Sequence, residues 1–288
     1  MPIRHISDTA RWVAFYRAME SERRDALFVD PWARRLAGAQ GETIVRTLPR
    51  AQSSAWAMIV RTAVFDELIL RLVQRESVDH VVNLAAGLDT RPFRLGLPPA
   101  LRWTDVDLPD ILAYKQETLA GVQPKCVYEA VAIDLTDATA RRTLFARLGD
   151  ASRRALIVTE GLLIYLTPEQ VGALADDLHA QPTFHDWLID IASPWLRKYM
   201  AKSWGKTLDA GGSQMHFFPE EGPKFFRPHG WRMVEFRSSL EEAHRLRREM
   251  KLAWLWRFMG KISSAERREA QRMISGVVLL ERAGTPDR

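Results

Sequence analysis

Short apolar runs alternate with helix-like stretches through the middle of this 288-residue chain. Runs of strand length stand at 80–85, 101–107, 126–134, 155–160 and 183–192. Between them, apolar residues recur at helical spacing over 108–120, 137–148 and 168–180. Strands that alternate with helices are typical of right-handed β-α-β crossovers. The pattern therefore predicts an α/β fold with a doubly wound, mostly parallel sheet of the Rossmann-like kind.

The segments on either side of this region follow other patterns. Residues 1–75 carry apolar positions at helical spacing throughout. Residues 193–229 are irregular and rich in aromatic residues, Gly and Pro, and two closing strands are expected at 231–236 and 274–282. An irregular insertion late in an α/β sheet is typical of a substrate lid. We therefore expect an N-terminal helical cap at 1–75 and a core domain at 76–288, with the lid at about 193–229.

Four consecutive predicted strands end in residues suited to contacting a ligand. The first leads into VVNLAAGLDTR, where Gly87 lets the backbone approach a ligand closely. The second ends at Asp107, where an acid can accept hydrogen bonds from two ribose hydroxyls. The third ends at Asp134 and Leu135, which suit the amine and the face of a flat base, and the fourth ends at Glu160. Ligands of open α/β sheets bind beyond the carboxyl ends of the strands, so these residues predict one binding site.

The chemistry of these residues favours a cationic ligand that contains a ribose and an adenine. A single glycine is fewer than a dinucleotide loop needs, and three carboxylates around one crevice repel a phosphate. S-adenosylmethionine meets both conditions, because its sulfur is positively charged and it has no pyrophosphate. Each residue also has a local explanation, since a strand-end Gly often forms a turn and a strand-end Asp often caps a helix. A nicotinamide-dependent oxidoreductase is a rival class, and it predicts more glycines in this loop.

Five stretches of the chain match a known pattern: SDTARWVAFYRAMESERRDALFVDPWARRLAG, RTAVFDELI, VVNLAAGLDTRPFRL, TDVDLPDILAYK and TEGLLIYLTPEQV. They resemble the leucine carboxyl methyltransferase and polyketide O-methyltransferase family, most strongly from residue 7 to about 175. The resemblance implies a class I methyltransferase fold with S-adenosylmethionine as cofactor. The cofactor residues that it implies are Arg61 at the methionine carboxylate, Gly87 in the loop, Asp107 at the ribose, Asp134 and Leu135 beside the adenine, and Glu160 near the methionine amino group.

The loop departs from the family pattern at two places. Many relatives have Gly where this chain has Ala85 or Ala86, and an acid where it has Asn83. An alanine narrows the loop slightly, which does not by itself imply an inactive protein.

The acceptor of the methyl group is less well defined. A carboxylate acceptor needs no base at neutral pH, whereas a hydroxyl acceptor does. We expect His185, His216 and His229 near the cleft, with His216 as the preferred base for a hydroxyl, and Tyr165, just past Glu160, facing the acceptor. The aromatic residues of the lid indicate a small apolar acceptor, polyketide-like or aromatic, as in secondary metabolism. Carboxyl methylation of a protein C-terminus and a non-catalytic S-adenosylmethionine-binding protein are the alternatives.

Composition restricts the remaining classes. The chain has 47% apolar residues and no run of about 18 uncharged ones, so we expect no membrane span and a cytoplasmic location. The single Cys126 excludes an internal disulfide, and no Cys/His cluster suggests a metal site. The net charge of +5 comes without a nucleic-acid-binding module, so no nucleic acid partner is expected. The Arg- and Trp-containing segment 244–261 favours a helix that packs its aromatic residues on the core, and peripheral contact with a membrane surface is the alternative. The oligomeric state stays open.

Overall fold

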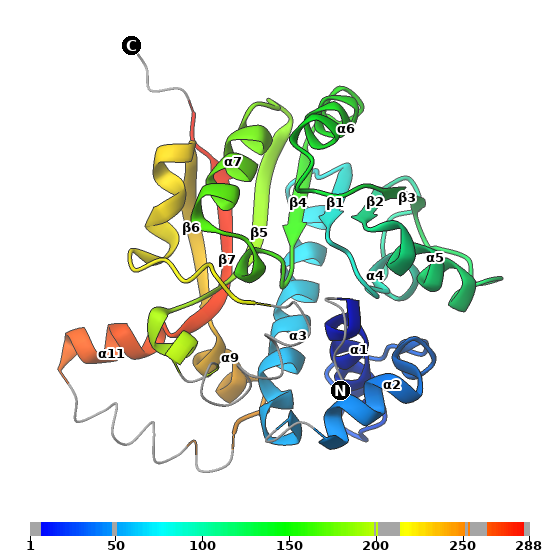
Figure 1. Cartoon of the computed structure of the whole chain (residues 1–288), viewed down its shortest axis with the longest axis vertical. Helices are drawn as coiled ribbons and strands as arrows, with labels where there is room; N and C mark the ends of the chain where they lie inside the picture. Colours follow the sequence, from blue (N-terminus) through cyan, green and yellow to red (C-terminus); the bar gives the residue numbers. More distant parts are fainter. Residues whose placement is uncertain are drawn as a thin grey trace.

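Seven strands form one sheet through the molecule in this computed structural model, which describes residues 7–47, 51–198, 200, 214–250, 253 and 264–284 (Figure 1). The strands are β1 (His80–Leu84), β2 (Arg102–Asp107), β3 (Val127–Ala132), β4 (Ala155–Thr159), β5 (Phe184–Ala192), β6 (Trp231–Ser238) and β7 (Ser275–Arg282). Their order across the sheet is β3-β2-β1-β4-β5-β7-β6. Strands β1 to β5 are parallel, whereas β7 runs antiparallel to both β5 and β6. The predicted mostly parallel, doubly wound sheet is therefore confirmed.

Helices cover both faces of this sheet. The N-terminal helices are α1 (Ser7–Ser21), α2 (Ala33–Thr47) and α3 (Ala51–Arg75). The later ones are α4 (Arg91–Arg94), α5 (Pro109–Thr118), α6 (Ala138–Asp150), α7 (Pro168–His179), α9 (Ser239–Arg245) and α11 (Ala265–Arg272), with 3-10 helices η1 (Leu163–Tyr165) and η2 (Gly222–His229). One apolar cluster joins α3 and α9 to one face, and another joins α6, α7 and η2 to the other. Helix α3, which the sequence analysis assigned to the cap at 1–75, thus packs on one face of the sheet. The domain boundaries stay a prediction.

Strand β4 shows why the apolar runs predicted strands so well. All five of its residues are buried. Its side chains alternate between the two faces, with Leu156 and Val158 in the cluster of α3 and Ala155 and Ile157 in the cluster of α6 and α7. A strand buried on both faces has no polar side to present, so its sequence is a continuous apolar run.

The topology places many chain segments at one edge of the sheet. Parallel strands β1 to β5 all end there, and the antiparallel β7 begins there. Helices α1 and α2 pack against each other and lie beside α3 near this edge, as Figure 1 shows in dark blue. In the part of the chain that the structure describes, no helix is long and apolar enough to cross a membrane. Most of the segment 250–263, and with it much of the predicted surface helix, lies outside the described residues.

Candidate active site

A cavity of about 1180 Å³ lies at the carboxyl edge of the sheet, between the strand ends and helices α1 and α3. Single-ligand sites commonly measure ~300–1,000 Å³, so this cavity has room for a cofactor and an acceptor together. The predicted residues that line it are Arg61, Gly87, Asp107, Asp134, Leu135, Glu160 and Tyr165. The structure therefore brings every predicted cofactor residue into one space.

The glycine loop and the acid of the second strand contact each other directly. The backbone N–H of Gly87 donates to Asp107 Oδ2 at 2.6 Å, and that of Leu108 donates to Oδ1 at 2.7 Å. Gly87 has a φ of +51°, and a Cβ there would lie 3.2 Å from Cβ of Ala10 in α1. Burial raises the pKa of Asp107, and the two amide donors oppose this rise only in part. The loop thus needs a glycine, and it orients the carboxylate at the mouth of the cavity.

Ala85 occupies a backbone conformation that favours glycine. Its φ is +54°, in the left-handed region. A residue with a Cβ is disfavoured there by roughly 1–2 kcal/mol. The departure from the family pattern at this position therefore introduces local strain and leaves the turn itself in place.

Asn83 bridges two carboxylates beneath the loop. Its Nδ2 donates to Asp89 Oδ2 at 3.0 Å and to Asp105 Oδ1 at 3.1 Å. The fully buried Asp105 also accepts from Lys115 Nζ at 2.6 Å and from the Tyr128 hydroxyl at 2.8 Å. The amide thus supplies a donor to each acid, whereas an acid at position 83 would place a third carboxylate there without a donor.

Arg61 lies between two acids at the ends of β4 and β5. Its Nε donates to Glu160 Oε1 and its Nη1 to Asp190 Oδ2, both at 3.0 Å. Glu160 Oε2 also lies 2.8 Å from Arg91 Nη1. Burial by itself raises the pKa of Glu160, but Arg91 and Arg61 outweigh it, and the pKa falls below its ordinary value. Glu160 is therefore ionised at neutral pH.

Sequence reasoning missed Asp190. This acid lies near the carboxyl end of β5 and lines the same cavity. Its Oδ1 accepts from the backbone N–H of Gly161 at 2.6 Å. The pattern that selected the acids at the ends of the second, third and fourth strands would have selected Asp190 too, had it been applied to LIDIA in the fifth.

Asp134 and Leu135 line the cavity from the loop after edge strand β3. Asp134 is exposed, and its Oδ1 accepts from the Thr136 backbone N–H at 2.8 Å and from the Thr136 hydroxyl at 2.7 Å. The cap of the following helix is Asp137. Asp134 thus holds a local turn and also faces the cavity, and its role beside an adenine stays a prediction.

The remaining wall of the cavity is largely apolar. Tyr165 stands at the end of η1, where burial raises the pKa of its hydroxyl, so this group is neutral at pH 7. Large apolar side chains also line the cavity: Trp12, Trp56, Met58, Trp195, Leu196, Met200, Met215 and Leu240. Only part of the predicted aromatic lid can be placed, because residues 199 and 201–213 lie outside the described part.

The histidines predicted near the cleft lie elsewhere. No histidine lines the cavity among the residues that the structure describes. His216 is exposed, although its backbone N–H donates to the Ile164 carbonyl at 2.8 Å. His229 lies 2.8 Å from Asp176 through Nδ1, and His185 stands at the start of β5, at the opposite edge of the sheet. Proximity to the lid in the sequence was therefore misleading, and a role for His216 as a base has no geometric support.

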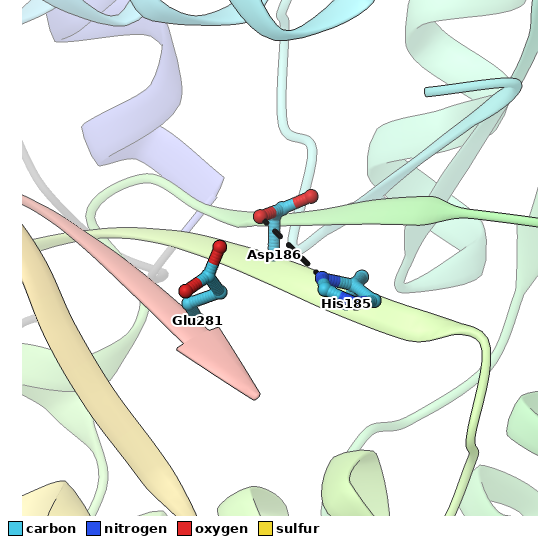
Figure 2. A group of neighbouring side chains, drawn as sticks. All are labelled: His185, Asp186 and Glu281. Atoms are coloured by element: carbon cyan, nitrogen blue, oxygen red, sulfur yellow. Dashed lines mark ion pairs between the residues drawn. The ribbon is translucent and has the colours of Figure 1, made fainter. Parts of the chain in front are cut away.

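His185 belongs to a group of three side chains at that opposite edge (Figure 2). Its possible ligand atoms and those of Asp186 and Glu281 lie within 4.8 Å of one another. Arg154 donates to both oxygens of Asp186 at 2.9 and 3.2 Å, and Arg232 pairs with Glu281 at 2.7 Å. Because these arginines already balance the two acids, the group is explained as an ion-pair network.

Comparisons with known proteins agree with this arrangement. A family model described as leucine carboxyl methyltransferase matches residues 10–179. A relative from Parafrankia sp. (strain EAN1pec), named "Putative S-adenosyl-L-methionine-dependent methyltransferase", is 38% identical over 183 residues, 60% of this chain and 58% of the relative. A relative of the same name from Mycobacterium sp. (strain KMS) is 33% identical over 259 residues, 81% of this chain and 84% of the relative.

The fold is shared with a solved structure that has little sequence similarity. A crystal structure titled as a putative methyltransferase from Thermobifida fusca YX superposes with a TM-score of 0.62 at 15% identity and covers 99% of this chain and 97% of that one. The match to the relative from Parafrankia sp. spans about three fifths of that relative's length, 58%. The family match covers well over half of the chain and contains the glycine loop, Asp107 and Glu160. The chain therefore belongs to the leucine carboxyl methyltransferase family.

Proposed function

We propose that this chain is an S-adenosylmethionine-dependent O-methyltransferase whose acceptor is the carboxylate of a small apolar molecule. One observation carries the proposal: the cavity combines acids at the strand ends with an apolar wall that contains no described histidine. Membership of the family and the names of its relatives support the same activity.

The charges of the cavity fit this cofactor. The acids that line it are Asp89, Asp107, Asp134, Glu160 and Asp190, and the arginines are Arg17, Arg61 and Arg91. Each of these arginines already pairs with a carboxylate. The excess of acids favours a ligand with a positive charge and disfavours a phosphate.

The chain's own residues would bind and orient the cofactor from end to end. Asp107 accepts hydrogen bonds from the ribose, and Leu135 packs beside the base. Arg61 binds the carboxylate of the amino-acid end, and Glu160 lies near its amino group. The cofactor supplies a methyl group on a positively charged sulfur, which needs no further activation.

The apolar side chains of the wall indicate the kind of acceptor. Trp56, Trp195 and Met215 present apolar surface to the cavity. A carboxylate is ionised at pH 7, so it needs no base, and the described wall provides no histidine as one. Because apolar side chains dominate the described wall, the cavity suits a carboxylate on an apolar body better than a peptide terminus. Alignment of the reactants can then contribute up to ~7–11 kcal/mol to catalysis.

The test combines binding with product chemistry. S-adenosylmethionine and its demethylated product should each raise the melting temperature of the protein, because a ligand of the native state stabilises it by mass action. NADH should not. The protein is then incubated with methyl-labelled S-adenosylmethionine and an extract of small molecules, and the product is treated with mild alkali.

Each outcome distinguishes one function. Release of labelled methanol from small molecules is expected, because methyl esters hydrolyse in alkali. Alkali-stable label would indicate a hydroxyl acceptor, and alkali-labile label on protein would indicate a C-terminus. A thermal shift without any labelled product in a range of extracts would favour a non-catalytic binding protein.

A further inference from the structure

Asp190 shares the wall of the cavity with Arg61 and Glu160. It lines the cavity near the carboxyl end of β5, next to the glycine that follows Glu160. One oxygen accepts from the Gly161 backbone N–H at 2.6 Å, and the other accepts from Arg61 Nη1 at 3.0 Å. These contacts fix the position of the carboxylate precisely enough for it to act on a ligand.

The ion pairs around Asp190 contain more acids than arginines. In the described part of the chain they join three arginines, which are Arg61, Arg91 and Arg94, to four acids, which are Asp66, Asp89, Glu160 and Asp190. One carboxylate is therefore not neutralised within the network. A partly buried carboxylate whose charge is not fully compensated favours a cation on the ligand.

Asp190 carries more of this unbalanced charge than Glu160 does. Each oxygen of Glu160 pairs with an arginine, Oε1 with Arg61 at 3.0 Å and Oε2 with Arg91 at 2.8 Å. Within the described residues Asp190 pairs with Arg61 alone, because its other oxygen accepts from a neutral amide. Its side chain is also more exposed, 23% against 12% for Glu160.

We propose that Asp190 is a cofactor-binding residue that receives the ammonium group at the amino-acid end of the ligand. This inference rests on the proposed function, and it assigns the ammonium contact to Asp190 because Glu160 is already compensated by an arginine on each oxygen, whereas Asp190 has one arginine. Asp190 also holds Arg61 from the side opposite Glu160, so the two acids share the amino-acid end of the site.

The experiment removes one partner of the contact at a time. Isothermal titration measures binding of S-adenosylhomocysteine, and of its analogue that lacks only the amino group, to the full-length wild type and Asp190→Asn. Asp190→Asn should bind S-adenosylhomocysteine about 10- to 100-fold more weakly, as expected for a lost charge-assisted hydrogen bond. It should bind the analogue within about threefold of wild type, because that ligand has no group to lose.

A matched variant controls for the loss of an acid from β5. Asp186→Asn makes the same change on the same strand at the opposite edge of the sheet, where Asp186 pairs with Arg154. It should leave both affinities unchanged, and thermal unfolding checks that both variants fold. If Asp190→Asn weakens both ligands equally, the acid acts only by holding the Gly161 loop, and the inference is wrong. Unchanged affinity for S-adenosylhomocysteine also overturns it. A wild type that binds neither ligand refutes the proposed function itself.

Discussion

Replacing Asp107 by Ala tests the strand-end carboxylate that the loop and the cavity share. The variant removes an acceptor that holds the Gly87 and Leu108 amides at 2.6 and 2.7 Å. A ribose diol would lose two hydrogen bonds to a charged acceptor at roughly 1.5–3 kcal/mol each, or roughly 3–6 kcal/mol together, which corresponds to about 10²–10⁴-fold weaker binding. The two amides also lose their partner, so we expect a loss of about 1–3 kcal/mol in the free energy of unfolding.

The pH dependence of binding gives a second measure of the same group. Burial raises the pKa of Asp107 above its ordinary value of 3.8, so in the folded, ligand-free protein the carboxyl takes up its proton at a higher pH than in the unfolded chain. The contribution of Asp107 to the stability of the ligand-free protein is therefore complete below its pKa in the unfolded chain and is lost as pH rises through its pKa in the folded protein. Hydroxyl donors of a ligand prefer the ionised form, so affinity should fall as pH falls through the raised pKa.

Titration calorimetry with S-adenosylhomocysteine, at several pH values from neutral down to the ordinary pKa of an aspartate, measures the loss of affinity in the variant and the pH dependence of affinity in the wild type. Wild type should lose affinity toward low pH, whereas Asp107→Ala should bind weakly throughout without this dependence. Unfolding in urea separates the loss of stability from the loss of binding. A folded Asp107→Ala variant with wild-type affinity would show that the carboxylate only holds the loop.

Three further changes test the loop and the wall of the cavity. Ala85→Gly should leave the free energy of unfolding unchanged or raise it by up to about 1 kcal/mol, because relief of the positive φ offsets the entropy of the added glycine. The control variant Ala86→Gly, at a buried position without positive φ, should lower the free energy of unfolding. Equal losses of stability in both variants would show that Ala85 is not strained. Asn83→Asp should lower the free energy of unfolding, measured in urea at pH 7, by about 3–5 kcal/mol. Part of this stability should return as pH falls and the new carboxyl group is protonated. A variant as stable as wild type would show that the Asn83 hydrogen bonds to the two acids do not stabilise the fold. His216→Ala should leave methyl-ester formation within about twofold of wild type, since a lost general base would instead slow it ~10²–10⁴-fold.

The amino-acid sequence by itself determined the elements of the sheet and the residues at its edge. All seven strands follow from local pattern, because strands such as ALIVT are buried on both faces and their apolar character needs no distant partner to be seen. Gly87, Asp107 and Glu160 follow from the same local signal, since each lies at the carboxyl end of a strand or within three residues of it. The topological rule that parallel strands end at one edge then predicts their proximity without coordinates.

Tertiary structure alone decided which charges pair and which side chains face the cavity. Arg61 meets Glu160 and Asp190 from a helix far away in the chain, and only the family resemblance could select it from the sequence. His216 lies within the predicted lid yet does not line the cavity. Such outcomes depend on how helices rotate and dock on the sheet, and a local pattern contains no record of that rotation. Long-range ion pairs and cavity walls are made by packing, so they became visible only once the chain was folded.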